Sequence, residues 1–168
     1  MNHRIKRILL PTAPLLGLLT CLLGCASVPK ANLEADDGEE RARIGQRLNQ
    51  IFDAAQKKDL ERLDSYHFYG PKFTKFSASF PGRQDAATAR QGEHNGITAA
   101  NDLKMNAEDL KVDIFGNVAI ATFNLNFSFK TDSGVVERKE QSTLVFVKDR
   151  GEWKIAHEHF SPIPSAAR

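Results

Sequence analysis

The sequence predicts an α+β domain in which N-terminal helices pack on the concave face of a cone-shaped, curved antiparallel sheet. Near the N-terminus, apolar residues recur at helical spacing, at Ile44, Leu48, Ile51, Phe52 and Ala55. The C-terminal part, Gly116–Pro162, instead holds three apolar runs of strand length. The turn signals Asp132-Ser133-Gly134 and Asp149-Arg150-Gly151 separate these runs, which predicts two consecutive hairpins. Helices that precede a meander of strands are typical of the α+β class.

The first 24 residues are predicted to lie outside this domain. Three basic residues precede an apolar stretch, Ile8–Leu23, and Leu22-Leu23-Gly24-Cys25 closes it. This is the layout of a secretory signal peptide, and its end resembles the lipobox of bacterial lipoproteins, in which the cysteine is lipidated. The alternative is a transmembrane anchor. The stretch is short for that role, because a spanning helix needs about 20 apolar residues, and it contains two prolines.

The division that follows is a signal peptide over 1–24, a tether over 25–36 that is rich in small residues, and one domain over 37–164. Cleavage before Cys25 would remove Cys21, so a single, acylated cysteine would remain and no disulfide could form. It would also remove three positive charges and lower the formal net charge from +2 to −1. A nucleic-acid partner then lacks electrostatic support. Ala26 after the cysteine resembles an outer-membrane sorting signal, which predicts a lipid-anchored location in the bacterial envelope, facing the periplasm.

Two helices are expected at the start of the domain. The first runs over about 37–57, with an N-cap at Asp36-Asp37 and the negative charges of Glu39-Glu40 in its first turn, where the helix dipole favours them. Asp59 can cap a second, shorter helix. This helix should end near Tyr66, because Gly70-Pro71 cannot continue it.

The rest of the domain is predicted to be mainly strands. Lys72–Phe80 should form one that stops at Pro81-Gly82, and Leu103–Phe115 another. Between them, 84–98 should form only one or two irregular helical turns, because each of its two glycines weakens a helix by up to about 1 kcal/mol. In the last strand, strict alternation would put five residues on one face: Trp153, Ile155, His157, His159 and Ser161.

The end of the chain carries a family resemblance. Gly151–Ser161, GEWKIAHEHFS, resembles the G-x-W-x-(I/V)-x-H-x-H-x-S ending of SnoaL-like domains in the nuclear transport factor 2-like superfamily. The nearest local likeness is to the association (hub) domain of calcium/calmodulin-dependent kinase II. Lys58-Asp59-Leu60 and Gly116-Asn117-Val118-Ala119 fit the same template, and the resemblance covers roughly 39–162.

This resemblance implies a cone that encloses an apolar cavity and a homodimer formed through the outer face of the sheet. The superfamily includes isomerases, dehydratases, polyketide cyclases and assembly modules, so the fold alone does not choose among them. The hub domain places two arginines in its pocket, and the matching positions here are Leu125 and Leu144. Recognition of a small carboxylate of the hub type is therefore not expected.

The candidate catalytic residues are His157, His159 and Tyr66. The histidines could donate protons near neutral pH, or they could be structural and bond to neighbouring strands. A tyrosine, Tyr66 or Tyr69, could polarise a carbonyl, but the positions expected to face the pocket carry no carboxylate that could act as a base. The predicted ligand pocket consists of Tyr66, Phe76, Phe123, Leu125, Phe127, Leu144, Phe146, Trp153, His157 and His159.

No metal site or cofactor is predicted, because His67, His94, Asp85 and Glu93 do not stand at motif spacing. The first hypothesis is a membrane-tethered, non-catalytic domain that binds a small apolar ligand or a protein partner. The alternative is an enzyme of the isomerase, cyclase or dehydratase type that uses the terminal-strand histidines and a tyrosine. A third possibility is a purely structural envelope module whose pocket is collapsed.

Overall fold

A computed structural model describes residues 37–164, so the predicted signal peptide, the tether and Cys25 lie outside the described residues. The three helices and six strands of residues 37–164 confirm the predicted α+β class. None of the helices described between 37 and 164 is both long and apolar enough to cross a membrane. In chain order the elements are α1 Gly38–Gln56, α2 Leu60–Ser65, β1 Thr74–Ser77, β2 Phe80–Gln84, α3 Ala86–Ala99, β3 Asn101–Phe115, β4 Val118–Thr131, β5 Gly134–Asp149 and β6 Glu152–Pro162.

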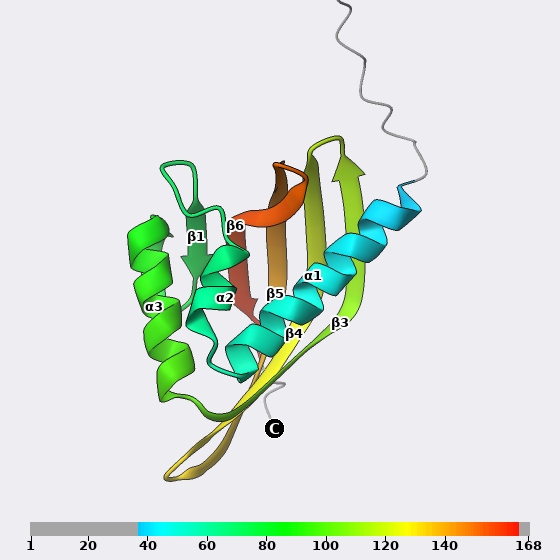
Figure 1. Cartoon of the computed structure of the whole chain (residues 1–168). Helices are drawn as coiled ribbons and strands as arrows, with labels where there is room; N and C mark the ends of the chain where they lie inside the picture. Colours follow the sequence, from blue (N-terminus) through cyan, green and yellow to red (C-terminus); the bar gives the residue numbers. More distant parts are fainter. Residues whose placement is uncertain (1–36, 165–168) are drawn as a thin grey trace, which may run out of the picture. The chain divides into compact units, whose positions relative to one another are not determined.

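The sheet has the strand order β2-β1-β6-β5-β4-β3, and the helices lie on one of its faces (Figure 1). The predicted meander is confirmed, because β3, β4, β5 and β6 pair in sequence and antiparallel. Arg150 and Gly151 both have positive φ in the tight turn before β6, as the Asp-Arg-Gly signal predicts. The sheet as a whole is mixed, because β1 pairs with β6 in parallel.

The first two helices form as predicted. Helix α1 buries an apolar stripe that includes Ile44, Leu48 and Phe52, and it runs obliquely across the sheet (Figure 1). Asp37 occupies its N-cap position without a side-chain cap bond. The carboxylate of Asp59 accepts a hydrogen bond from the Arg62 backbone N–H and so caps α2.

Two local predictions between 72 and 99 are wrong. The stretch predicted as one strand ends early, and a second strand, β2, passes through Pro81 and Gly82. Proline is tolerated there because β2 is an edge strand. Helix α3 is a regular helix of 14 residues rather than one or two turns. The side chain of Asp85 caps it by accepting a 2.9 Å bond from the Thr88 backbone N–H, which helps to offset the cost of its two glycines.

A β-bulge in β6 changes which side chains face the helices. Phe146 pairs with Ile155 and Val145 pairs with His157, so Ala156 is an extra residue on β6. The backbone of Ile155 bonds instead to the segment after α2, accepting from the Phe68 N–H and donating to the Tyr66 carbonyl. Because one extra residue reverses the alternation, the side chains beyond the bulge exchange faces.

The prediction that one face carries Trp153, Ile155, His157 and His159 is therefore wrong. Trp153 and Ile155 are buried, and beyond the bulge it is Glu158 that is buried, whereas His159 is exposed. The inward positions after the bulge belong to Glu158 and Phe160, and the histidines lie on the outer face.

Candidate functional site

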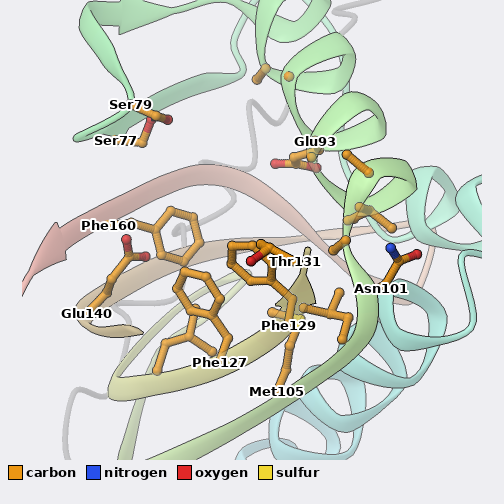
Figure 2. A pocket seen from close by; sticks show the side chains of 18 of the residues that line it. Ser77, Ser79, Glu93, Asn101, Met105, Phe127, Phe129, Thr131, Glu140 and Phe160 are labelled. Atoms are coloured by element: carbon orange, nitrogen blue, oxygen red, sulfur yellow. The ribbon is translucent and has the colours of Figure 1, made fainter. Parts of the chain in front are cut away.

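A cavity of about 750 Å³ lies between α3 and the inner face of the sheet (Figure 2). Its apolar wall includes the side chains of Leu125, Phe127, Phe129 and Phe160 from the long strands and Met105 from β3. On α3, most of the residues that line the cavity have small side chains or none: Ala89, Gly92, Gly96 and Ala99. The small residues of the helix therefore leave space that the sheet side chains do not fill.

A buried group of four charged side chains, which we call the charge cluster, adjoins this cavity. It consists of His67 after α2, Lys75 on β1, Glu93 on α3 and Glu158 on β6. The parallel pairing of β1 with β6 places Lys75 beside Glu158. Lys75 and Glu93 are also part of the cavity wall. The cluster thus joins α3 to two strands and presents two of its members to the cavity.

The ammonium of Lys75 bridges the two carboxylates of the cluster. It lies 2.8 Å from Glu158 Oε2 and also forms an ion pair with Glu93 Oε1. The imidazole of His67 lies on the other side, with Nε2 3.1 Å from Glu158 Oε1 and 3.7 Å from Glu93 Oε2. All four side chains are nearly buried, so these contacts are weakly screened by water.

The hydrogen bonds of His67 indicate that the ring is an imidazolium. Its Nδ1 lies 3.0 Å from the Leu63 carbonyl oxygen, which can only accept, so Nδ1 carries a hydrogen. Its Nε2 faces Glu158. Burial disfavours the charged ring, but the hydrogen bond and charge of Glu158 outweigh it and raise the pKa of His67 to about 9.

The same balance fixes the charges of Glu158 and Lys75. Burial favours the neutral forms of both groups, yet each has an opposite charge in contact. The charges of Lys75 and His67 therefore hold the pKa of Glu158 well below its usual range, and the charges of Glu158 and Glu93 hold the pKa of Lys75 above its usual range.

Glu93 differs from the other members of the cluster. Burial and the nearby negative charge of Glu158 raise the pKa of Glu93 to about 7, although Lys75 and His67 act in the opposite direction. The hydroxyl of Tyr69 donates a 2.9 Å hydrogen bond to Glu93 Oε2. Burial, followed by the charge of Glu93, raises the pKa of Tyr69, so this hydroxyl stays a donor. A carboxyl on the cavity wall that titrates near neutral pH can both accept and give a proton.

His67, Glu93 and Glu158 also have the composition of a metal site. One ligand atom of each lies within 4.8 Å of the others. However, the ammonium of Lys75 already pairs with both carboxylates, and the His67 ring is protonated on both nitrogens. A metal ligand must be deprotonated, so these residues fit an internal ion cluster better than a metal site.

The sequence-predicted pocket residues divide into three groups. Leu125 and Phe127 line the cavity. Five others are buried in the core and are not part of its wall: Tyr66, Phe123, Leu144, Phe146 and Trp153. The remaining three lie on the outer face, where the ring of Phe76 contacts the rings of His157 and His159.

The three candidate catalytic residues are bonded within the fold and are not brought together. His157 Nδ1 lies 2.8 Å from Thr74 Oγ1, and His159 Nε2 lies 2.9 Å from Ser161 Oγ. The Tyr66 hydroxyl accepts a 2.8 Å bond from Arg62 Nε. Burial, followed by the charge of His159, lowers the pKa of His157. The His157 contact reaches the neighbouring strand β1, as the structural interpretation expects, whereas His159 bonds to a residue of its own strand.

The expectation that no carboxylate faces the pocket is wrong. Glu93 and Glu140 are part of the cavity wall, and Glu158 lies directly behind Lys75. Sequence reasoning missed Glu158 because it could not see the bulge at Ala156. The large apolar Phe160 stands two residues after Glu158, and this was a signal that their shared face turns inward. Glu93 was missed because α3 was not expected to be regular.

Comparison with known proteins assigns the chain to a family of domains. The family model described as "SnoaL-like domain" matches residues 44–166. A nuclear transport factor 2-like protein from Streptomyces avermitilis, named as a candidate dehydratase, superposes with a TM-score of 0.69 at 16% identity over 76% of this chain and 99% of that one. A nuclear transport factor 2-like protein from Salmonella enterica gives 0.68 at 14% identity over 77% and 95%.

The association domain of calcium/calmodulin-dependent kinase II from C. elegans gives a TM-score of 0.63 at 19% identity, over 74% of this chain and 96% of that one. At these identities the likeness shows the fold alone. No curated protein sequence matches. Because the family model covers well over half of the chain, the protein belongs to the family of SnoaL-like domains, with the fold of the nuclear transport factor 2-like superfamily.

Proposed function

We propose that residues 37–164 form a ligand-binding domain whose cavity takes a small, largely apolar molecule. The observation that carries this proposal is the cavity of about 750 Å³ beneath α3, which is the size of sites that hold small ligands. Its wall combines aromatic and aliphatic side chains with polar side chains such as Lys75, Glu93 and Glu140, and binding sites are lined by both kinds. A purely structural module would have a collapsed pocket, whereas the space between α3 and the sheet is open.

The test is to fill the cavity without damaging the fold. A Cβ built on Gly96 meets no atom within 4 Å, and Gly96 is part of the cavity wall. In Gly96→Leu the new side chain should occupy the cavity and, because leucine favours a helix over glycine, the domain should not lose stability. Binding of the neutral fluorescent probe N-phenyl-1-naphthylamine by the purified chain should fall at least tenfold.

Gln91→Leu is the matched control. Gln91 is exposed on the same helix and does not line the cavity, so this substitution adds the same apolar side chain outside it. It should bind the probe like the unchanged protein. Equal loss in both variants, or unchanged binding in Gly96→Leu, would contradict the proposal.

We further propose that the domain is tethered to the bacterial outer membrane through a lipid on Cys25. The basic and apolar N-terminal stretch and the Leu22-Leu23-Gly24-Cys25 sequence support this. The measurement is mass spectrometry of the N-terminal peptide together with cell fractionation. Cys25→Ser should leave the precursor uncleaved and unlipidated. If the unchanged protein carries no diacylglyceryl group on Cys25, the proposed tether is contradicted.

A second candidate function is that of an enzyme that moves a proton, which the position of Glu93 favours. Its carboxyl lies on the cavity wall, titrates near neutral pH and accepts a bond from Tyr69. The Streptomyces relative named as a candidate dehydratase is of this class. Carbonyl compounds that bind the cavity should exchange an acidic C–H for deuterium in heavy water, and Glu93→Gln should abolish the exchange. Bound compounds that never exchange would leave only the binding role.

We also propose that two copies associate through the outer face of the sheet. No helix among residues 37–164 covers this face (Figure 1), and Phe115 and Val118 are exposed on it. Ile120 and Val145 lie opposite each other on the same face. The relationship to association domains supports oligomer formation. Sedimentation should give a dimer that Val145→Glu converts to a monomer, and a monomer in the unchanged protein would contradict this.

A further inference from the structure

The charged groups around the cavity leave one half-buried negative side chain without a partner. Lys75 and Glu93 are paired within the charge cluster, and Lys130 lies 3.0 Å from Asp102. Asp132 is exposed in the β4–β5 turn. The carboxylate of Glu140 has no hydrogen-bond or ion-pair partner anywhere in residues 37–164. The inner wall therefore has an uncompensated negative charge.

Glu140 faces inward from β5, where it pairs with Leu125 of β4. Its carboxylate lies beside the rings of Phe127 and Phe160 at one end of the cavity (Figure 2). Burial raises the pKa of Glu140, and the more distant charges of Lys75 and Arg138 offset this only in part. A carboxylate in such surroundings gains from a cation that comes into contact with it.

The aromatic rings at this end also suit a positive charge. Cations are attracted to the faces of aromatic rings, more strongly where water is excluded. The fold already uses this attraction, because the Lys75 ammonium lies 5.0 Å from the centre of the Phe160 ring. Lys75 itself is held by Glu93 and Glu158, so it compensates the charge of Glu140 only in part.

We propose that the ligand of this cavity is an organic cation, with an apolar body and an amine or quaternary ammonium group. The charged group pairs with Glu140 and contacts the rings of Phe127 and Phe160, and the apolar body occupies the space under α3. This inference rests on the proposed ligand-binding function and specifies the class of ligand. It differs from recognition of a carboxylate, for which the wall offers no unpaired cation among the described residues.

The experiment compares three probes of equal chain length and different charge: decyltrimethylammonium, decanol and decanoate. Their affinities for the purified chain are measured by displacement of N-phenyl-1-naphthylamine below the micelle-forming concentrations. Decyltrimethylammonium should bind about tenfold more tightly than decanol, which corresponds to about 1.4 kcal/mol, and decanoate should bind more weakly than either.

Glu140→Gln should remove the preference for the cation and leave decanol binding unchanged. Glu140→Lys should reverse the order, so that decanoate binds more tightly than decyltrimethylammonium. Glu137→Gln is the matched control, because Glu137 lies on the same strand, is exposed, and does not line the cavity. It should bind all three probes like the unchanged protein.

The outcomes separate this inference from the function on which it rests. If decanol binds but the cation has no advantage, or if Glu140→Gln keeps the advantage, the inference is overturned and the binding function stands. If none of the three probes displaces the bound fluorophore, the inference is overturned; if the purified chain binds neither the fluorophore nor any of the probes, the binding function is overturned as well.

Discussion

The two ends of the helical layer cover the sheet in different ways. Helix α1 buries six residues against the strands: Ile44, Leu48, Ile51, Phe52, Ala54 and Ala55. Among the residues of α3, Ala89 alone is buried. On the α1 side, ring contacts such as that between Phe52 and Phe123 belong to a packed core beside a smaller pocket of about 320 Å³ between α1 and β3, whereas the α3 side contains the cavity of about 750 Å³.

Helix α3 is attached to the rest of the domain mainly by polar contacts, whereas α1 is attached by an apolar stripe. Glu93 bonds to Lys75 and Tyr69. Arg90 and His94 both reach Asp64, at 2.6 Å and 2.8 Å. Apolar packing fills the space between a helix and a sheet, because its energy comes from close contact. Charged side chains can hold a helix at its edges and leave the space between open, which is what a binding site requires.

The largest effect should come from a truncation on the packed side. Phe146 is fully buried, so Phe146→Ala should lower the free energy of unfolding by about 3–5 kcal/mol. Phe127→Ala on the cavity wall should cost clearly less, because its ring already adjoins empty space. Urea denaturation of both variants gives the comparison. Equal losses would mean that the two sides are packed alike.

The next largest effect should come from the charge cluster. Glu158→Gln leaves the charges of Lys75 and His67 buried with only Glu93 to compensate them, and this should cost about 3 kcal/mol. Glu108→Gln is the control, because Glu108 forms an exposed pair with Lys139 and should change stability by less than about 0.5 kcal/mol. If Glu158→Gln left the free energy of unfolding unchanged, the cluster would not stabilise the fold.

Stability should fall as the solution becomes alkaline. The pKa of His67 is raised to about 9 in the folded state, so its stabilisation is complete below its unfolded value of 6.5 and is lost as the pH rises through 9. Between about pH 6.5 and 8.5 the loss should be about 2 kcal/mol. The raised pKa of Glu93 adds a loss of the same sign at lower pH. His67→Gln should flatten this slope, and an unchanged slope would assign it to other groups.

The smallest effect should appear in local opening. Asp64→Asn weakens the contacts of Arg90 and His94, which should favour opening of α3 by about 1 kcal/mol or less. Amide hydrogen exchange should become faster in α3 and stay unchanged in α1. Asp53→Asn, which weakens comparable pairs with Lys57 and Arg62, is the control and should not affect α3. If Asp64→Asn made exchange equally faster in α1 and α3, the proposed difference between the two helices would be contradicted.

The packed side could be predicted from the sequence, whereas of the cavity side only the strand residues Leu125 and Phe127 could be. The stripe of Ile44 and Leu48 and the alternation in β4 are strong periodic signals, and they indicated the helix, the meander and the class. A bulge has no such signal, so Ala156 reversed the expected faces of His157 and Glu158. Glu93 and Lys75 lie 18 residues apart on different elements, and their pairing depends on where α3 packs, which the local sequence pattern does not determine.

The most direct test of the ligand cavity is to locate a bound molecule by the methyl resonances that it perturbs. When decanol is added, we predict chemical-shift changes at the methyl groups of Ile97, Leu103 and Leu125, which line the cavity, and none at Ile44 and Ile51 under α1, which line neither the cavity nor the smaller pocket. Changes confined to Ile120 and Val145 on the outer face, or no changes at all, would contradict it.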